Sequence, residues 1–463
     1  MQSEVAKKTT RRMVFVGLPF FFVLASSAIP QSSEPQKPAS ETPSTHRYAN
    51  MPDEAVPYGK FTKPYKEWYV DKDTLDYFGG ARERVVKEID TSNTVNIGFL
   101  GPLVNNYEAP YGQAMLHGAQ MALEEANARG GYGARGASHG RPYELKIHND
   151  SAQWGASSTE AVKMAFDENV VAVLGSIDGA STHIMLRVYL KLEVPIMDTG
   201  TTDPTVTETR IPWLIHTFPD DRQQGYTLAD YVFKKMKLKK IGVFRTQSRY
   251  ARIGVEKFSD EAKRMGRVPP LEVKFERGDQ DFSTQLRMLQ NSHIDGLVIW
   301  GEAPDAARIL NQMRAMGMKQ PVFGSSRMAY PALLEIAGSA AEGVVTTAPL
   351  DPTRTDPQWQ DFRKNYQAKF KEEPDAYAAY AYDGMSILIG AIEKKGLNRG
   401  KIMDGLREYH GKSYEGVGER EEFDYTLNNI APLALAKVEG GKFVYLPAQR
   451  RESSAAHTGA GAP

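Results

Sequence analysis

The sequence predicts an α/β protein built from two doubly wound, Rossmann-like lobes that follow the same plan. The first observation is an alternation of short apolar runs and helical repeats between Val95 and Met197, in the order β, α, β, α, β, α, β. The second is that the same alternation starts again at Lys240 and continues to Gly324. Strands that alternate with helices form parallel sheets with helices on their faces. The length of 463 residues is enough for two or three such domains.

The first lobe is expected to contain parallel strands joined by helices. Each strand is a short run of apolar and β-branched residues, as a buried parallel strand requires. The predicted strands are Val95–Leu100, Tyr143–His148, Val170–Leu174 and Val194–Met197. Apolar residues at helical spacing predict the helices, which start at Gly112, span Ser157–Asn169, and follow Gly179 with Ser181 or Thr182 as the N-cap.

The second lobe repeats this pattern. The predicted strands are Lys240–Phe244, Glu272–Glu276, Gly296–Trp300 and Pro321–Gly324, and the predicted helices are Tyr250–Arg264, Phe282–Gln290 and Ala306–Met316. Helices return after Gly343–Thr347, over Gln358–Phe370 and Ala376–Lys394, before a β-hairpin of Ala431–Val438 and Lys442–Leu446. The segment Ile215–Asp220, which lies between the two sets, is the expected first hinge.

The stretch from Val170 to Pro204 carries the candidate site. Its strands each run into a turn rich in small and hydroxyl residues, at Gly179–Thr182 and at Thr199–Asp203. Ligands of open α/β sheets bind at the carboxyl edge of the strands, and the N–H groups at a helix start attract anions. Two such turns side by side could hold a carboxylate, although ordinary turns and helix caps have the same composition.

Composition and motifs exclude several classes of function. Lys+Arg and Asp+Glu both number 57, so nothing favours nucleic acid or an anionic membrane as the partner. Cysteine is absent, which excludes disulfides, thiolate catalysis and zinc-thiolate sites. The glycines of 131–136 match GxGxxG, but they follow a helix and precede a strand, whereas a dinucleotide site needs the opposite order. No HExxH or GxSxG motif and no metal cluster is found, so we expect neither a catalytic site nor a cofactor.

The two ends of the chain are expected to lie outside the lobes. Residues 1–28 are predicted to be a secretory signal peptide, because positive residues precede the apolar run Met13–Leu24 and small residues follow it. With no cysteine after this segment, we expect a soluble periplasmic or otherwise secreted protein that is not a lipoprotein. Residues 29–50 read as a disordered linker and 448–463 as a disordered tail. The aromatic-rich extension 51–92 is expected to pack on the main body.

Short motifs in a consistent order and spacing carry a resemblance to a known family. From Val95 to Leu446 the chain resembles the type I periplasmic binding proteins, in the branch of the leucine/isoleucine/valine-binding proteins that serve ABC importers. The matching motifs are Ile97-Gly98-Phe99-Leu100-Gly101-Pro102-Leu103, Gly118-Ala119, Val173-Leu174-Gly175 with Ser181-Thr182, Val194-Pro195-Ile196, Phe218-Pro219-Asp220-Asp221 with Gln224-Gly225, Lys240-Ile241-Gly242-Val243, Tyr250 with Gly254, Asp281-Phe282-Ser283, Gly343-Val344 and Tyr382-Asp383-Gly384.

The resemblance implies two lobes joined by three crossovers, which close on a small ligand. It places residues 93–217 and 349–429 in the first lobe and residues 221–345 and 431–447 in the second. In the family's amino-acid binders, the two turns hold the ligand carboxylate and a tyrosine of the second lobe closes over the ligand. The residues implied here are Gly179, Ala180, Ser181, Thr182, Gly200, Thr201, Thr202 and Tyr250.

The sequence departs from the family's pattern at two places. The family's hydroxyl nearest the carboxylate appears as Gly179, so that contact would use backbone N–H. The acidic partner of a ligand ammonium would fall near Ser325 or Ser326, and neither carries charge. A buried ammonium without a counter-ion costs several kcal/mol, so Glu302 or Asp178 must replace the partner if the ligand is an amino acid. Glu302 is equally explained as a residue at a helix N-terminus.

The expected function is therefore solute binding rather than catalysis. A monomer would capture an amino acid or a related carboxylate and present it to a membrane ABC permease. Two alternatives stay open: a ligand-sensing module of a receptor, and a binder of another small molecule such as an amide or an aromatic acid. Trp300 and Tyr330 could line a pocket for an aromatic ligand, although Trp300 could equally belong to the core.

Overall fold

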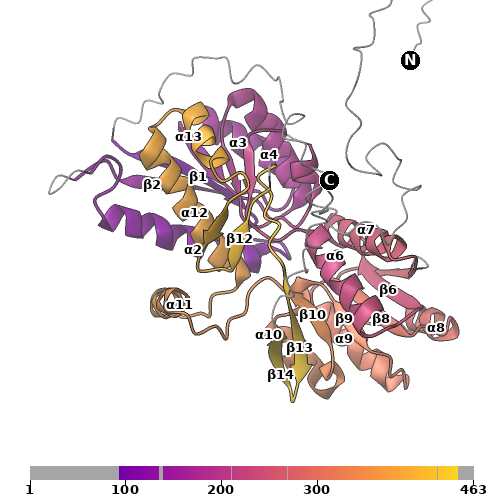
Figure 1. The fold of residues 1–463 in the computed structure, drawn as a ribbon. Helices are drawn as coiled ribbons and strands as arrows, with labels where there is room; N and C mark the ends of the chain where they lie inside the picture. The colour runs from indigo at the N-terminus through magenta and orange to yellow at the C-terminus, as the bar shows by residue number, and fades with distance from the viewer. Residues whose placement is uncertain (1–92, 135–138, 210, 268–269, 425, 447–463) are drawn as a thin grey trace, which may run out of the picture. The chain divides into compact units, whose positions relative to one another are not determined.

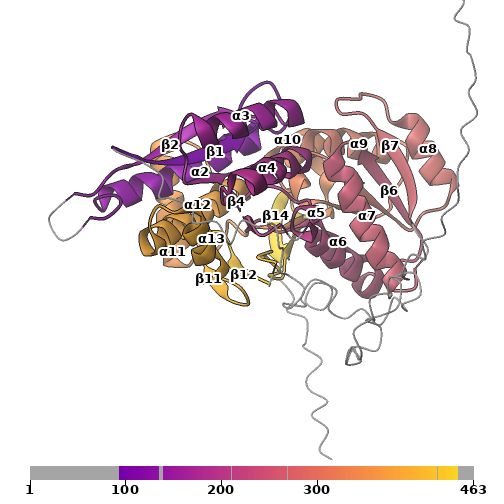
Figure 2. The same cartoon turned by 90° about the horizontal axis from the view of Figure 1, so that it is seen from above.

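The computed structural model describes residues 93–134, 139–209, 211–267, 270–424 and 426–446. The predicted signal peptide, linker, aromatic extension and tail lie outside the described residues. The main elements are two open sheets flanked by helices (Figures 1 and 2). Within the described ranges, no helix is long and apolar enough to cross a membrane.

The first sheet is parallel throughout and has the strand order β2-β1-β3-β4-β5. Its strands are β1 Val95–Gly101, β2 Tyr143–Asn149, β3 Ala172–Leu174, β4 Ile196–Asp198 and β5 Leu214–His216. The sequence predicted the first four of these; β5 was not predicted, and the segment Ile215–Asp220 expected as the first hinge begins inside it. The order places β3 and β4 side by side, so the turns that follow them meet at one edge of the sheet.

The second sheet has the order β14-β13-β10-β9-β8-β6-β7. Neighbouring strands in the run β7, β6, β8, β9 and β10 pair in parallel. Strands β13 and β14 form a hairpin that adds to β10 in antiparallel orientation. The strands are β6 Ile241–Thr246, β7 Leu271–Phe275, β8 Gly296–Trp300, β9 Val322–Gly324, β10 Val345–Ala348, β13 Ala434–Glu439 and β14 Lys442–Leu446. The two sheets therefore confirm the predicted pair of doubly wound units.

We call each sheet with its helices a lobe. The helices of the first lobe are α2 Ala109–Ala128, α3 Trp154–Phe166, α4 Gly179–Leu192, α5 Thr205–Glu208, α11 Pro357–Phe370, α12 Ala376–Lys395 and α13 Arg399–Arg407. It also holds a small hairpin of β11 Ser413–Glu415 and β12 Arg420–Glu422. The helices of the second lobe are α6 Asp221–Asp230, which continues as a π-helical turn over Tyr231–Lys235, α7 Arg249–Arg264, α8 Ser283–Asn291, α9 Ala303–Ala315 and α10 Pro331–Ala337. Short 3₁₀ turns span Ser326–Met328 and Gly338–Ala341.

Helix α2 begins earlier than the sequence predicted. It starts at Ala109 rather than Gly112, because Pro110 lies in the first turn, where a missing N–H leaves no hydrogen bond unmade. The residue before it, Glu108, is therefore held at a helix start instead of in a loop. Helix α6 was not anticipated, since it is mostly polar, yet a capping box between Asp220 and Gln223 fixes its start.

Helices α2 and α12 pack closely although they are far apart in sequence (Figure 1). A Cβ atom added at Gly118 of α2 would lie 2.0 Å from the carbonyl oxygen of Ala378 in α12. A glycine is required there, because a side chain would force the helices apart. The contact joins two segments on either side of the second lobe in the sequence into one lobe.

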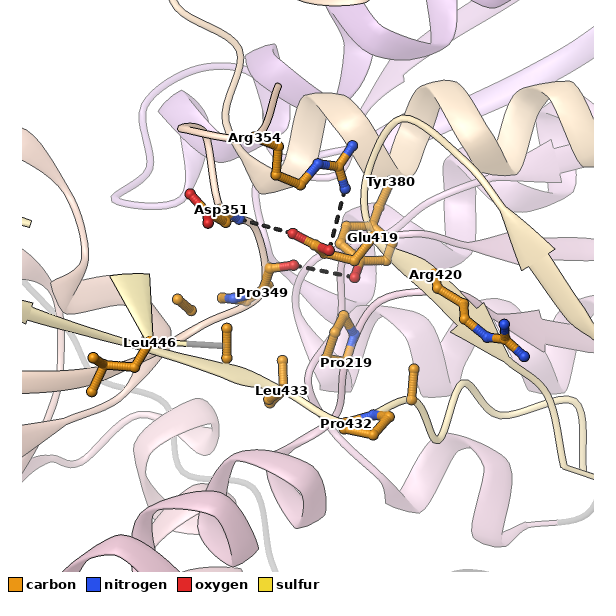
Figure 3. Close-up of a pocket in the computed structure, with 13 residues that line it drawn as sticks. Pro219, Pro349, Asp351, Arg354, Tyr380, Glu419, Arg420, Pro432, Leu433 and Leu446 are labelled. Carbon is orange, nitrogen blue, oxygen red and sulfur yellow. Dashed lines mark hydrogen bonds and ion pairs between the residues drawn. The ribbon is translucent and has the colours of Figure 1, made fainter. Parts of the chain in front are cut away.

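Three chain segments cross between the lobes, after β5, after β10 and before β13. They are tied together: Asn429 Nδ2 donates to the Thr217 carbonyl at 2.7 Å, and Gln223 Nε2 donates to the Ala431 carbonyl at 2.6 Å. A pocket of about 220 Å³ lies among them, lined by Pro219, Pro349 and Pro432 (Figure 3). The two hydrogen bonds tie the first and third segments, and Pro349 of the second lies beside them in the wall of the pocket.

Candidate ligand-binding site

The turn after β3 is built around Asp178. Its carboxylate accepts a hydrogen bond from the Ser181 backbone N–H at 2.8 Å, and Thr182 Oγ1 donates to its carbonyl at 3.0 Å. The N-cap of α4 is thus Asp178 and not Ser181 or Thr182 as predicted, because the helix starts three or four residues earlier, at Gly179. The Ser181 hydroxyl is left buried without a well-formed hydrogen bond to any described residue.

Gly179 occupies a position where no other residue fits without a shift. A Cβ atom at this position would lie 2.5 Å from Asp203 Oδ2, which belongs to the neighbouring turn. The family resemblance implies a hydroxyl side chain at this position. Here the position is a glycine, and the space is used for the close approach of the two turns.

The turn after β4 already uses several of its own donors. Asp198 accepts hydrogen bonds from the backbone N–H groups of Gly200 at 3.3 Å and Thr201 at 3.1 Å. Thr202 Oγ1 donates to Asp221 Oδ2 at 3.0 Å, which links this turn to the start of α6. The structure thus brings the two predicted turns together, while most of the polar groups in them have partners within the protein.

Arg327 of the second lobe lies against the first lobe and is 1% exposed. Its Nη1 atom lies 2.6 Å from Glu108 Oε1 of the first lobe and 3.4 Å from Glu302 Oε1 of its own lobe. Its Nε donates to the Tyr377 hydroxyl at 3.2 Å. A buried guanidinium is held here by both lobes at once, in a compact network of charges.

Aromatic rings surround this guanidinium. Its Cζ atom lies 4.0 Å from the ring centre of Tyr250 and 5.1 Å from that of Tyr111. The rings of Tyr111 and Tyr377 stack with centres 4.9 Å apart. Such ring faces stabilise a cation in a site that excludes water.

Tyr250 comes from the start of α7, at the place the sequence predicted for the residue that closes over the ligand. In the structure its ring covers Arg327, and its hydroxyl is buried without a well-formed hydrogen bond to a described residue. The Ser325 side chain is its hydrogen-bonding neighbour, and a buried hydroxyl bonded this poorly has capacity left for a ligand oxygen.

The two residues suggested as ammonium partners have other contacts. Glu302 lies 2.7 Å from Arg277 Nη2 as well as close to Arg327, and it forms no side-chain cap on α9. Asp178 is engaged as the cap of α4. Ser326, also a predicted site residue, donates its backbone N–H to Gln224 Oε1 at 3.0 Å.

The residues suggested as walls for an aromatic ligand lie behind the rings that surround Arg327: the Trp300 ring centre is 6.5 Å from that of Tyr250, and the Tyr330 ring centre is 5.3 Å from that of Tyr111. Trp300 is fully buried in the core of the second lobe. The Tyr330 hydroxyl donates to Asp375 Oδ2 at 2.9 Å.

A second cross-lobe ion pair lies at the turn after β4. Arg249 Nε of α7 donates to Asp203 Oδ2 at 2.6 Å, and its Nη2 donates to Thr205 Oγ1 at 3.0 Å. The ring of Tyr107 and the guanidinium of Arg277 make a third contact, with 5.4 Å between Cζ and the ring centre. The lobes are therefore joined by charged groups around the Arg327 network.

Burial and the repulsion between neighbouring carboxylates raise the pKa values of two acidic residues in this region. Burial raises the pKa of Asp178, and the Glu108 carboxylate raises it further. Burial raises the pKa of Asp221 well above its usual value, and Asp203 adds to this effect. Within the described ranges, no group of three or more His, Asp or Glu side chains is arranged to hold a metal ion.

Sequence reasoning missed Glu108, Arg327 and Tyr111. Glu108 was placed in a loop, and only the early start of α2 shows that its position is fixed. Arg327 follows β9 by three residues, so its place after a strand at the carboxyl edge was a usable signal. Its charge alone did not set it apart from other arginines.

Comparisons with known proteins agree with this fold. The sequence model of the family described as periplasmic binding protein matches residues 94–442. A Leu/Ile/Val-binding protein homologue of Brucella abortus is 27% identical over 305 residues, which cover 66% of this chain and 79% of the relative. A Pseudomonas aeruginosa protein that binds leucine, isoleucine, valine, threonine and alanine is 24% identical, over 73% and 90% of the two chains.

Solved structures show the same fold. A leucine-binding protein of Thermotoga maritima has a TM-score of 0.68 and 25% identity, over 76% of this chain and 98% of that one. A branched-chain amino acid binding protein of Streptococcus pneumoniae, in complex with isoleucine, has a TM-score of 0.67 and 26% identity, over 76% and 99%.

Proposed function

Because the chain belongs to the periplasmic binding protein family, we propose that it captures a small carboxylate, most simply an amino acid, between its two lobes. The observation that carries the proposal is the buried Arg327, which contacts both lobes and whose partner Glu108 lies close enough to Asp178, in the turn after β3, to raise the pKa of that carboxyl. A buried guanidinium with aromatic walls is a favourable partner for a carboxylate.

Two weakly bonded hydroxyls in the same region support a polar ligand: Ser181 interacts with the Asp178 carboxylate and Tyr250 with the Ser325 hydroxyl. The Ser181 and Tyr250 hydroxyls come from opposite lobes, and both are buried without a well-formed bond to a described residue. Buried polar groups are normally well hydrogen-bonded, and a hydroxyl with a poorly formed bond costs free energy. A ligand oxygen would relieve that cost only when both lobes surround it.

Relatives support the choice of an amino acid as the first candidate. The Streptococcus pneumoniae protein was solved with isoleucine, the name of the Brucella protein states leucine, isoleucine and valine, and that of the Pseudomonas protein adds threonine and alanine. The turns of the first lobe, including Gly179–Thr182 and Gly200–Thr202, would hold the ligand carboxylate through the donors they have left.

The mechanism would be closure about the three crossover segments. Ligand contacts made by both lobes favour the closed arrangement, because only that arrangement offers all of them. The Arg249–Asp203 pair would add to the closed form without touching the ligand. A membrane ABC permease would then recognise the two lobes in their closed positions.

The protein would act outside the cytoplasm. Residues 1–28 would direct export and be removed, and the mature protein would act as a soluble monomer outside the cytoplasm. The chain has no cysteine to carry a lipid. No catalytic step is proposed.

Thermal unfolding of the purified protein against paired ligands tests the proposal. Each amino acid is measured beside its analogue that lacks the amine, such as L-leucine with 4-methylpentanoate and L-phenylalanine with 3-phenylpropanoate. A ligand at a hundred times its Kd should stabilise the protein by about 2.7 kcal/mol, an easily measured rise in Tm. If neither series raises Tm and calorimetry finds no binding heat, the proposed function is wrong.

A further inference from the structure

The ion pair between Glu108 and Arg327 leaves one atom unused on each side. Glu108 Oε1 is bonded to Arg327 Nη1, but Glu108 Oε2 is buried and has no hydrogen-bond partner among the described residues. On Arg327, Nη1 and Nε make the recorded bonds, and Nη2 makes none within the described part of the chain. Each lobe thus offers an unsatisfied charged atom at the place where the lobes meet.

The two unused atoms differ in what they require. A carboxylate oxygen such as Glu108 Oε2 accepts hydrogen bonds and favours a cationic donor. The Nη2 group of Arg327 donates two hydrogen bonds and favours an anionic acceptor. A ligand that satisfies both must carry a donor cation and an acceptor anion a short distance apart, which describes the head of an α-amino acid.

We propose that Glu108 and Arg327 together select a zwitterionic ligand head, with Glu108 binding the ammonium group and Arg327 binding the carboxylate. The inference rests on the proposed function, because it assumes that the ligand lies between the lobes. It assigns the ammonium to a residue of the first lobe, whereas the sequence suggested Glu302 or Asp178.

The contacts of those two residues favour Glu108 instead. Glu302 is shared by Arg277 and Arg327, so an approaching ammonium would meet two guanidinium groups beside it. Asp178 accepts the Ser181 N–H that starts α4, and taking this acceptor away would leave a helix end uncapped. Glu108 Oε2 is the acidic oxygen of these three residues that is buried without a partner.

The test measures, by titration calorimetry, the ratio of Kd values for an amino acid and its desamino analogue. The probes are L-leucine with 4-methylpentanoate, L-phenylalanine with 3-phenylpropanoate, and L-glutamate with glutarate. The wild-type protein should prefer the amino acid by at least about tenfold, because its analogue leaves Glu108 unpartnered. In Glu108→Gln the amino acid should bind at least about tenfold more weakly, while the analogue changes little, so the ratio falls towards one.

Two further variants keep the test decisive. In Glu108→Gln/Arg327→Gln both charges are removed together, so no lone charge is left in the pair, and both members of a ligand pair should lose affinity. Arg363→Gln is the matched control, since Arg363 pairs with Glu373 on the surface of α11 and lies in no part of the site. Circular dichroism and Tm confirm that each variant is folded.

The possible results distinguish a failure of the Glu108 assignment from a failure of the proposed function. If the protein binds carboxylates but the wild-type ratio is near one, or Glu108→Gln leaves the ratio unchanged, the selection by Glu108 is wrong while the proposed function stands. If no amino acid or analogue binds the wild-type protein, both are wrong. A ratio that falls only in the Glu108 variants supports the inference.

Discussion

Arg249 in α7 and Asp203 in the turn after β4 form an ion pair across the two lobes, with 2.6 Å between Nε and Oδ2. The same Asp203 oxygen lies where a side chain on Gly179 would have to be. One carboxylate therefore fixes the approach of two turns and holds the opposite lobe against them.

The first prediction concerns this pair. Arg249→Gln should raise the Kd of every ligand by about tenfold and change the Tm without ligand very little. The pair contributes only when the lobes are together, and a charge-assisted hydrogen bond contributes about 1.5–3 kcal/mol before partial exposure reduces it. Calorimetry with an amino acid and its desamino analogue checks that both are weakened equally. A selective loss of one of them would mean that Arg249 contacts the ligand.

The second prediction concerns Gly179. Gly179→Ala should lower the free energy of unfolding by about 1–3 kcal/mol and weaken ligand binding, because the added methyl group displaces Asp203. Gly155→Ala is the control: this glycine lies in α3, and nothing is within 4 Å of its added Cβ. Chemical denaturation should find the control equal to or more stable than the wild type, since alanine favours a helix. Equal stability of both variants would contradict the close approach of the turns.

The sequence was sufficient for the fold because fold patterns are local. Strand β8 was predicted with its observed bounds, and β1 and β2 to within one residue, since apolar runs followed by glycine or polar turns need no distant information. The polar α6 was missed because it carries no periodic apolar face, and β5 was missed because Ile215 and His216 were assigned to the hinge segment.

The site was only partly predictable, because its contacts join residues that are far apart in the sequence. The turns after β3 and β4 could be found, as they follow from the position of strand ends. The bond between Glu108 and Arg327 joins residues 219 positions apart, and no local pattern announces which of 57 basic side chains will be buried between lobes. The unpaired oxygen of Glu108 becomes visible only when its neighbours are in place.

The third prediction concerns the packing of α2 on α12. Gly118→Ala should destabilise the protein by several kcal/mol, because the Ala378 carbonyl is backbone and has no room to move aside. Gly390→Ala in α12 is the matched control, since its added Cβ meets nothing within 4 Å, and it should stabilise by up to about 1 kcal/mol. Urea denaturation of both variants checks the difference. A mild effect of Gly118→Ala would show that the helices can separate at low cost.

The last prediction concerns buried carboxyl groups near the hinge. Burial raises the pKa of Asp383 to about 7, although the N–H groups of Val417 and Gly418 donate to it. Burial raises the pKa of Glu421 well above its usual value, and the neighbouring Asp383 adds to the shift. Neither oxygen of Glu421 has a hydrogen-bond partner among the described residues. Both groups therefore favour the protonated form in the folded protein.

The sign of the effect follows from proton counting. The unfolded chain releases these protons near pH 4, whereas the folded protein keeps them to about pH 7 at Asp383 and also retains the one on Glu421. The folded state thus binds more protons between these values, and stability should fall as pH rises, by up to about 1.4 kcal/mol per pH unit for each proton. Glu421→Gln should reduce the pH dependence of stability by the contribution of one proton. Glu415→Gln, a change at an exposed residue, should leave the pH dependence unchanged. Urea denaturation at pH 5, 6, 7 and 8 measures the slopes, and equal slopes in wild type and Glu421→Gln would show that Glu421 keeps no proton.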